Sequence, residues 1–301
     1  MSLPKIIVIV GPTASGKTEF AIETAEKIGG EIISADSLQI YKEFSICTSK
    51  PTKEQLKRVK HNLIGHISVS SEYSVYSFVQ DAKQKIKEII NNKKTPIVTG
   101  GTGLYIDALI NDFQFENSSC EENNNIDILS GNAGEITEEN NKNLYEILKK
   151  LDPLSAKYIN QNDIKRINHA INFFNKFGFS IYNQKINTEK IKLESEIKKE
   201  FEVIKLGLNF KNRDILYDRI NKRVDLMLQN GLLEEINCVR KLEVSKTASA
   251  AIGYKELLPY FKGETTLYQA IEKIKQQTRR YAKRQITWFK RSPITKWIFK
   301  D

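Results

Sequence analysis

The stretch Gly11-Pro12-Thr13-Ala14-Ser15-Gly16-Lys17-Thr18 decides the fold that we predict for this chain. It follows an apolar, β-branched run at 5–10, typical of a buried parallel strand, and it precedes a segment of helical periodicity at 19–28. The pattern G-x-x-x-x-G-K-[ST] therefore stands in the strand–loop–helix context that a phosphate-binding loop requires. Its backbone N–H groups and the positive end of the helix dipole suit phosphate oxygens, Lys17 supplies a mobile charge, and the Thr18 hydroxyl can bind Mg²⁺. The stretch predicts that a phosphate chain binds here, without identifying the molecule that carries it.

A second candidate site follows the next predicted strand, at 31–34. In open α/β sheets ligands bind at the carboxyl ends of the strands, so we expect Asp36 to lie in the same crevice as Lys17. Asp before an apolar run is also a common helix cap, and the local sequence leaves both roles open for Asp36.

A further buried strand at 95–99 leads into a second glycine-rich turn, Gly100-Gly101-Thr102-Gly103. It is either a tight turn without a ligand or a neighbour of the first loop in a doubly wound sheet. No apolar run with an Asp that would make a convincing Mg²⁺-binding aspartate of an ATPase follows it, and this absence disfavours a site that hydrolyses ATP.

The composition bounds the class of protein. The chain has 301 residues, 40% of them hydrophobic and 28% charged, which suits one large or two modest folded domains. Lys and Arg number 47 against 37 Asp and Glu, and the net charge of +10 favours a polyanionic partner. Cys47, Cys120 and Cys238 are scattered without metal-ligand spacing, so we expect a reducing compartment. Because the sequence has no long apolar run and no signal peptide, we expect a cytoplasmic protein without membrane contact.

The middle of the chain differs in character from its two ends. A polar, low-complexity stretch at 112–143 is expected to be mobile, and helices are predicted at 143–151, 154–159 and 163–177. Strand pattern returns at 201–208, and long helices are predicted at 212–229 and 270–291. We therefore predict an α/β protein: a P-loop NTPase-like core of parallel sheet flanked by helices, made of 1–112 and 200–301, with a helical domain inserted at 113–199.

The last of these helices is strongly basic. One face is predicted to be buried and carries an apolar stripe made of Ile271, Ile274, Thr278, Ala282, Gln285 and Phe289. Cations crowd the remainder: Lys273, Lys275, Arg279, Arg280, Lys283, Arg284, Lys290 and Arg291. Such a helix suits the backbone of a nucleic acid, or is simply a solvated face.

Taken together, the motifs resemble the tRNA dimethylallyltransferases, also called tRNA isopentenyltransferases. The matching segments occur in the family's order over nearly the whole chain, at 11–18, 36–42, 48–51, 100–105, 163–166, 219–223, 252–256 and 282–289. The phosphate loop alone is unspecific, but its combination with Asp-Ser-x-x-x-Tyr and Ala-Lys-Arg-Gln-x-Thr-Trp is highly specific.

The resemblance implies transfer of a dimethylallyl group from dimethylallyl diphosphate to N6 of the adenosine on the 3′ side of a tRNA anticodon. It implies that Asp36, Lys17, Thr18, Arg223 and Thr102 are catalytic, with Asp36 as the base and Thr18 as the Mg²⁺ ligand. The diphosphate would bind residues 11–18 with Arg219 and Arg223, although which arginine faces it stays open. The inserted domain would grip the anticodon arm, and we expect a monomer. The implied tRNA contacts are Asp36, Ser37, Leu38, Gln39, Lys165, Arg166, Ile252, Gly253, Tyr254, Lys255, Lys275, Arg279, Lys283 and Arg284.

The chain departs from the family pattern at two single positions and in the segment before residue 143, which lacks the family's usual Pro- and Arg-containing pattern. His169 stands where the family usually has a second Arg, and Cys47 stands where many relatives have Gly.

An adenylate isopentenyltransferase acting on a free nucleotide would share the phosphate loop and Asp36 but would need neither the basic helix nor the insertion. A small-molecule kinase would use the same loop to turn over ATP. A non-enzymatic RNA-binding module would leave Lys17, Thr18 and Asp36 without a role.

Overall fold

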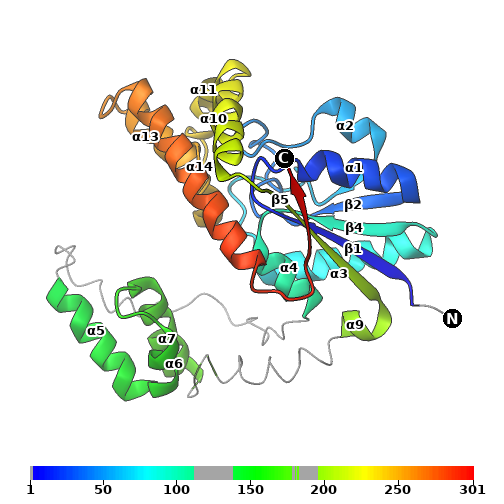
Figure 1. Ribbon diagram of the computed structural model, residues 1–301. Coiled ribbons are helices and arrows are strands. Elements are labelled where there is room, and N and C mark those ends of the chain that lie inside the picture. The colour runs from blue at the N-terminus through cyan, green and yellow to red at the C-terminus, as the bar shows by residue number, and fades with distance from the viewer. Residues whose placement is uncertain (1–2, 112–137, 178–179, 181, 183–195) are drawn as a thin grey trace. The chain divides into compact units, whose positions relative to one another are not determined.

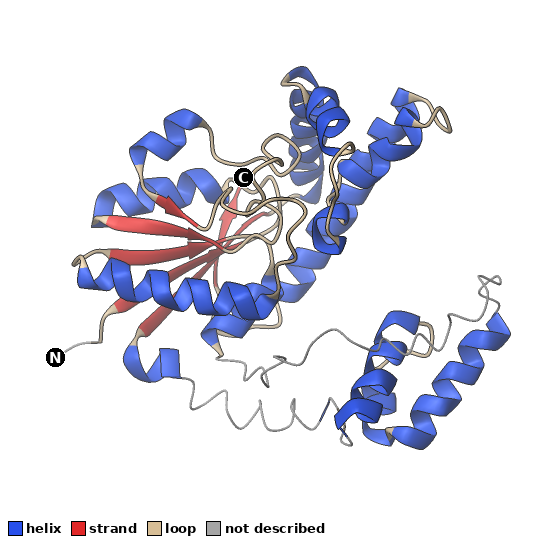
Figure 2. Cartoon of the chain, turned by 180° about the vertical axis from the view of Figure 1, so that it is seen from behind, coloured by secondary structure: helices blue, strands red, loops and turns tan. Residues whose placement is uncertain are grey.

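A six-stranded parallel sheet forms the centre of the larger unit (Figures 1 and 2). The computed structural model describes residues 3–111, 138–177, 180, 182 and 196–301. The strands lie in the order β3-β2-β4-β1-β5-β6. Their bounds are β1 Lys5–Val10, β2 Gly30–Ser34, β3 His61–Asn62, β4 Thr95–Thr99, β5 Glu202–Phe210 and β6 Lys296–Lys300. The predicted α/β class with a parallel sheet is confirmed.

Helices cover both faces of this sheet. Figure 1 shows α1 (Lys17–Ile28) and α3 (Val75–Asn91) on opposite sides, with α2 (Lys53–Arg58) beside α1. Ala21, Ile22 and Ala25 of α1 are buried against alternate side chains of the strands, including Ile9 and Ile32. Because successive strand residues point to opposite faces and both faces are covered, the central residues of β1 and β4 must be apolar, as they are at Ile6–Val10 and at Ile97 and Val98.

The carboxyl ends of β1, β2 and β4 meet at one edge of the sheet because these strands are parallel. β1 leads into the phosphate loop, β2 into Asp36, and β4 into the glycine turn before α4 (Gly103–Ile110). Figure 1 shows a layer of helices beyond this edge: α10 (Arg213–Gln229), α11 (Leu232–Val239), α13 (Tyr254–Phe261) and α14 (Leu267–Phe289). The short helix α12 (Lys246–Ser249) comes between α11 and α13 in the chain. The sheet edge and this layer supply the walls of the candidate site.

The chain divides into two compact units, residues 1–112 with 196–301 and residues 113–195. The second boundary lies four residues before the one expected from the sequence, since the short helix α9 (Glu196–Glu200) belongs to the larger unit. Of the polar stretch 112–143, expected to be mobile, residues 112–137 lie outside the described residues, whereas 138–143 form the first turns of the helix α5 (Glu138–Leu151), contrary to that expectation.

The smaller unit contains α5 (Glu138–Leu151), α6 (Pro153–Tyr158) and α7 (Ile164–Phe177). Leu148, Ile167 and Ala170 are fully buried between these helices. Asp152 ends α5 and caps α6, because its carboxylate accepts the Ser155 N–H at 2.9 Å and Pro153 begins the helix. A small helical core therefore forms within the insertion.

Candidate active site

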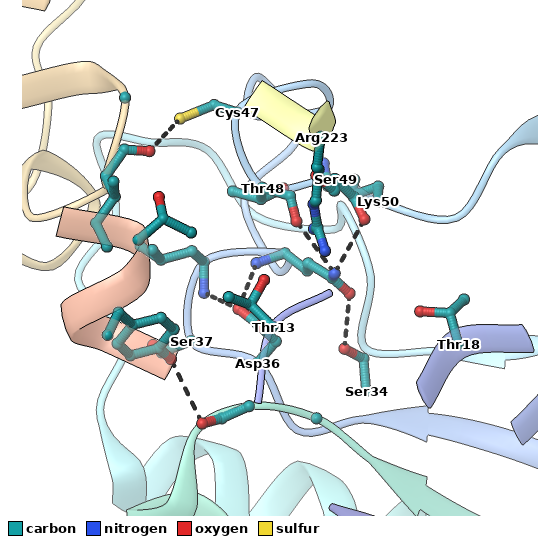
Figure 3. A pocket seen from close by; sticks show the side chains of 18 of the residues that line it. Thr13, Thr18, Ser34, Asp36, Ser37, Cys47, Thr48, Ser49, Lys50 and Arg223 are labelled. Carbon is teal, nitrogen blue, oxygen red and sulfur yellow. Dashed lines mark hydrogen bonds between the residues drawn. The ribbon is translucent and has the colours of Figure 1, made fainter. Parts of the chain in front are cut away.

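A cavity of about 630 Å³ opens at the carboxyl edge of the sheet (Figure 3). Its walls come from the phosphate loop, the segment after β2, the loop 47–51, the glycine turn after β4, and helices α10 and α14. The sequence-predicted residues that line it are Thr13, Lys17, Thr18, Asp36, Ser37, Leu38, Gln39, Arg223, Ile252, Gly253, Lys255 and Arg284. The fold thus brings four of the five predicted catalytic residues to one place, all but Thr102, together with part of the predicted binding residues.

The phosphate loop has the backbone that its sequence requires. Gly16 has φ 86° and Ala14 has φ 62°, so the chain curls through the left-handed region before α1 begins. At Gly11 a Cβ atom would lie 2.4 Å from the carbonyl oxygen of Leu208 in β5, which excludes any larger residue. Pro12 and Ser15 are buried, and the Lys17 ammonium donates to the Pro12 carbonyl at 2.7 Å. The loop is therefore folded around its own lysine.

Lys17, Arg223 and Asp36 interact electrostatically inside the cavity. Burial and the neighbouring Arg223 guanidinium lower the pKa of the Lys17 ammonium to about 7, although Asp36 opposes this shift. Burial likewise lowers the pKa of Arg223, and Asp36 again opposes the shift. In Figure 3 the Arg223 side chain extends from α10 toward Asp36. Two cations are held here beside one carboxylate, which leaves an excess of positive charge suited to an anionic ligand.

Asp36 also caps the turn that follows it. Its Oδ1 accepts the N–H groups of Leu38 at 3.0 Å and Gln39 at 3.3 Å. The sequence leaves open whether this residue is a cap or a catalytic group, and the structure places it both in a cap and in the cavity wall.

Thr102 supports the Asp36 segment from the glycine turn. Its Oγ1 accepts the Ser37 N–H at 3.0 Å and its hydroxyl donates to the Ser37 Oγ at 3.3 Å. The neighbouring Gly100 and Gly101 line the cavity, whereas Thr102 is not part of its lining. Its contacts therefore favour a role in holding Ser37 and Asp36.

Glu235 of α11 holds the loop that faces Asp36, and no signal in the sequence marks it for this role. Its carboxylate accepts three backbone N–H groups, from Ser45 at 2.8 Å, Ile46 at 2.7 Å and Cys47 at 2.8 Å. The same loop presents Ser49, whose Oγ accepts the Arg223 Nε–H at 2.7 Å. Glu235 thereby fixes the partner that orients Arg223.

Cys47 is buried in this wall and its thiol donates to the Ile252 carbonyl at 3.1 Å. Burial raises the pKa of the thiol well above its ordinary value, and Glu235 adds to the shift. A protonated, buried thiol acts as a small apolar wall residue rather than as a nucleophile.

A smaller cavity of about 340 Å³ adjoins the phosphate loop on its other side. Lys17, Thr18 and Arg223 line both cavities, whereas Arg219 lines only the smaller one. The Arg219 Nε–H donates to the Ala14 carbonyl at 2.9 Å, and its guanidinium lies over the Phe210 ring. Arg223 is thus the arginine beside Asp36, and Arg219 braces the loop.

Thr18 stands where the two cavities meet, and the carboxylate of Asp36 lines the larger one. Among the residues that the structure describes, no group of three His, Cys, Asp or Glu side chains could enclose a metal ion. Mg²⁺ commonly takes one or two protein oxygens, substrate phosphates and several waters. This sparse oxygen donor set therefore fits a Mg²⁺ ion that arrives with a diphosphate.

The predicted tRNA contacts separate into two groups in the structure. Lys165 and Arg166 are exposed on α7 of the smaller unit, where Arg166 pairs with Asp163 at 3.3 Å. Tyr254, by contrast, is buried against Phe44 and does not line the cavity, so its side chain does not fit the expected contact. The sequence around an aromatic residue that follows a glycine turn does not show whether its side chain packs into the core or faces a ligand.

Lys275 and Arg279 also depart from expectation. The Lys275 side chain is only 16% exposed and its ammonium pairs with Asp225 of α10 at 2.8 Å and with Glu272 at 3.4 Å. The Arg279 guanidinium donates to Asn221 of α10 at 2.6 Å. These two cations join α14 to α10, and such partners within the chain favour a structural role over the expected contact with tRNA phosphates. Arg280, Lys283 and Arg284 remain exposed on the same helix.

This division of α14 predicts two distinct phenotypes. Changing Arg280 and Lys283 to Gln should reduce the slope of log affinity for tRNA against log salt by about 0.7 to 0.9 for each phosphate that the helix no longer neutralises. Changing Lys275 and Arg279 to Gln should leave that slope unaltered and lower the free energy of unfolding by about 1 to 2 kcal/mol. tRNA titrations at several salt concentrations and urea denaturation separate the two. A reversed pattern would show that the α10-facing cations reach the RNA.

Comparison with known proteins places the chain in one family. The family model described as IPP transferase matches residues 39–292. A tRNA dimethylallyltransferase of Thermoanaerobacter sp. (strain X514) is 45% identical over 302 aligned residues, which cover 99% of this chain and 92% of the relative. The corresponding protein of Staphylococcus epidermidis (strain ATCC 35984) is 40% identical, with 100% of this chain and 88% of the relative covered.

Solved structures agree with these relatives. A tRNA delta(2)-isopentenylpyrophosphate transferase from Staphylococcus epidermidis has a TM-score of 0.68 and 38% identity, and the match covers 98% of this chain and 93% of that one. A eukaryotic dimethylallyltransferase solved while acting on tRNA has a TM-score of 0.76 and 30% identity, covering 95% and 70%. No helix among the described residues is long and apolar enough to cross a membrane. On the family model and the full-length relatives, the chain belongs to the tRNA dimethylallyltransferase family.

Proposed function

We propose that this enzyme transfers the dimethylallyl group of dimethylallyl diphosphate to N6 of the adenosine on the 3′ side of a tRNA anticodon. The observation that carries the proposal is the placement of Lys17, Arg223 and Asp36 around one cavity at the carboxyl edge of the sheet. It unites the groups that a leaving diphosphate needs with a base for the attacking amine.

The donor side of the reaction belongs to the phosphate loop. The free backbone N–H groups at the start of α1, together with the positive end of the helix dipole, suit a bound anion. Lys17 and Arg223 add two positive charges. As the bond between C1 of the dimethylallyl group and the diphosphate oxygen breaks, its electron pair goes to the diphosphate. Fixed cations in a cavity of low dielectric stabilise that developing charge.

The acceptor side belongs to Asp36. The adenine amine is a poor nucleophile because its lone pair is delocalised into the ring. A carboxylate that accepts a hydrogen bond from N6 and takes one proton as the new N6–C1 bond forms removes the resulting positive charge. Because N6 is out of reach within a stacked anticodon loop, the base must turn out of its stack to enter the cavity.

A Mg²⁺ ion held by the Thr18 hydroxyl and the diphosphate would neutralise part of the leaving-group charge. Arg219 keeps the loop in shape through the Ala14 carbonyl, so that its N–H groups stay directed at the phosphates. The exposed cations of α14 and of the smaller unit, Arg280, Lys283, Lys165 and Arg166, would meet the tRNA backbone. The proposal includes a cytoplasmic, monomeric enzyme, and free thiols at Cys47 and Cys238 are compatible with a reducing compartment.

Mass spectrometry of tRNA nucleosides after incubation with dimethylallyl diphosphate and Mg²⁺ tests this function. We expect N6-isopentenyladenosine from tRNA and none from free AMP, which the adenylate isopentenyltransferase alternative would require. We also expect no phosphate release from ATP, with or without tRNA, because the sequence after the glycine turn at 100–103 lacks an apolar run with an Asp suited to the Mg²⁺ of an ATPase. Product from AMP alone, or ATP turnover, would contradict the proposal.

A further inference from the structure

Gln285 is a buried polar residue of α14 whose amide contacts two separate loops of the active site. Its side chain lines the cavity and the residue is only 5% exposed. Its Oε1 accepts the N–H of Thr13 at 2.8 Å, and its Nε2 donates to the carbonyl of Gly101 at 3.0 Å. Both ends of one amide are therefore used, one on the phosphate loop and one on the glycine turn after β4.

The second of these contacts continues toward the proposed base. Gly101 is followed by Thr102, whose hydroxyl accepts the Ser37 N–H, and Ser37 follows Asp36 directly. A continuous path of hydrogen bonds and chain segments therefore runs from the phosphate loop through Gln285 to Asp36. Through Gln285 and Thr102, side-chain hydrogen bonds thus join the loop that would hold the leaving group to the segment that would hold the base.

We propose that Gln285 is a positioning residue that fixes the phosphate loop relative to Asp36. The inference rests on the proposed transfer reaction, in which the diphosphate and N6 must lie on opposite sides of the same carbon atom. A shift of about 1 Å between such groups costs on the order of 10²-fold in rate even when both substrates still bind. Gln285 touches neither reacting atom in this scheme, and its effect passes through Thr13 and Gly101.

The two hydrogen bonds require an amide at position 285, and the close contact with that amide requires glycine at position 101. Methionine has nearly the same length but can neither accept the Thr13 N–H nor donate to the Gly101 carbonyl. A Cβ atom at Gly101 would lie 2.3 Å from the Gln285 Nε2, and the backbone of Gly101 is outside the left-handed region, so alanine there mainly displaces the amide. Gln285→Met and Gly101→Ala thus break the same contact from its two sides.

The experiment compares single-turnover rates of these two variants at saturating dimethylallyl diphosphate and tRNA. We expect each rate to fall by about 10- to 100-fold, while the dissociation constants of the donor and of tRNA stay within about threefold of wild type. Gln277→Met, on the same helix and outside the cavity lining, is the matched control and should keep the wild-type rate. Circular dichroism melting curves verify that all variants fold.

A double-mutant cycle distinguishes positioning from simple support of the fold. If Gln285 acts through Asp36, Gln285→Met should cost less than about threefold in an Asp36→Asn background, where the base is already removed. A full, additive loss there, or equal falls in rate and donor affinity, would overturn the inference. Wild-type rates in both Gln285→Met and Gly101→Ala would also overturn the inference. A folded wild-type chain that forms no prenylated tRNA would instead overturn the proposed function and this role with it.

Discussion

Replacing Asp36 by asparagine is expected to slow single-turnover prenyl transfer by about 10²-fold or more, with tRNA affinity nearly unchanged, because the amide cannot take the N6 proton. Asparagine keeps an oxygen that can accept the Leu38 and Gln39 N–H groups, so the turn after β2 survives. Alanine removes both the base and the cap. Asp36→Ala should therefore be at least as slow and should also melt at a lower temperature.

The pair of variants separates the two roles that the structure gives to this carboxylate. Rates are measured with prebound tRNA, and filter binding reports tRNA affinity. If Asp36→Asn reacts within about threefold of wild type while Asp36→Ala is slow, Asp36 is a turn cap and another group takes the proton.

The sequence predicts most of the core because its signals are local. The strands at 5–10 and 95–99 match their predicted bounds, and α10 lies within one residue of the helix predicted at 212–229. Continuous apolar runs ended by glycine specify a buried parallel strand with few alternatives. The β6 strand and α11 were not predicted. β6 is an edge strand of five residues with exposed side chains, and such a segment carries a weak pattern.

Side-chain direction on α14 was harder to predict than the helix itself. Periodicity correctly placed Ile274, Ala282 and Phe289 on the buried face. It could not show that α10 packs beside that face and presents Asp225 and Asn221 to two of the cations. The partner of a charged residue depends on tertiary packing, which a helical pattern does not contain.

The supporting residues of the site were missed for the same reason. Glu235 contacts a loop about 190 residues earlier in the chain, and Gln285 contacts a loop 272 residues earlier. A glutamate on an amphipathic helix has no local feature that marks it as an acceptor of three N–H groups. Gln285 lies within the family motif, but the motif does not indicate its contacts. Its place on the apolar stripe of the helix is the one feature that indicates a supporting role, because a buried amide there needs hydrogen-bond partners.

Lys17 gives the last prediction, which concerns protons as well as rate. Burial and the Arg223 guanidinium lower the pKa of its ammonium to about 7 in the free protein, so the neutral form predominates at pH 8. A bound diphosphate favours the charged form and raises this pKa. Donor binding at pH 8 should therefore take up close to one proton, and binding at pH 6, where the lysine is already charged, should take up almost none. Above pH 7 the affinity should fall, by at most about tenfold per pH unit.

Calorimetric titration of dimethylallyl diphosphate in buffers of different ionisation enthalpy measures this uptake without tRNA or turnover. Lys17→Arg keeps a permanent charge and should abolish the uptake at pH 8, whereas Lys17→Met should abolish it and also reduce transfer by about 10²- to 10³-fold. Lys222→Met removes an exposed cation that lines the smaller cavity and should leave the uptake in place. An uptake that persists in both Lys17 variants would mean that the titrating group is elsewhere, such as the diphosphate itself. Wild-type turnover by Lys17→Met would remove this lysine from the leaving-group site.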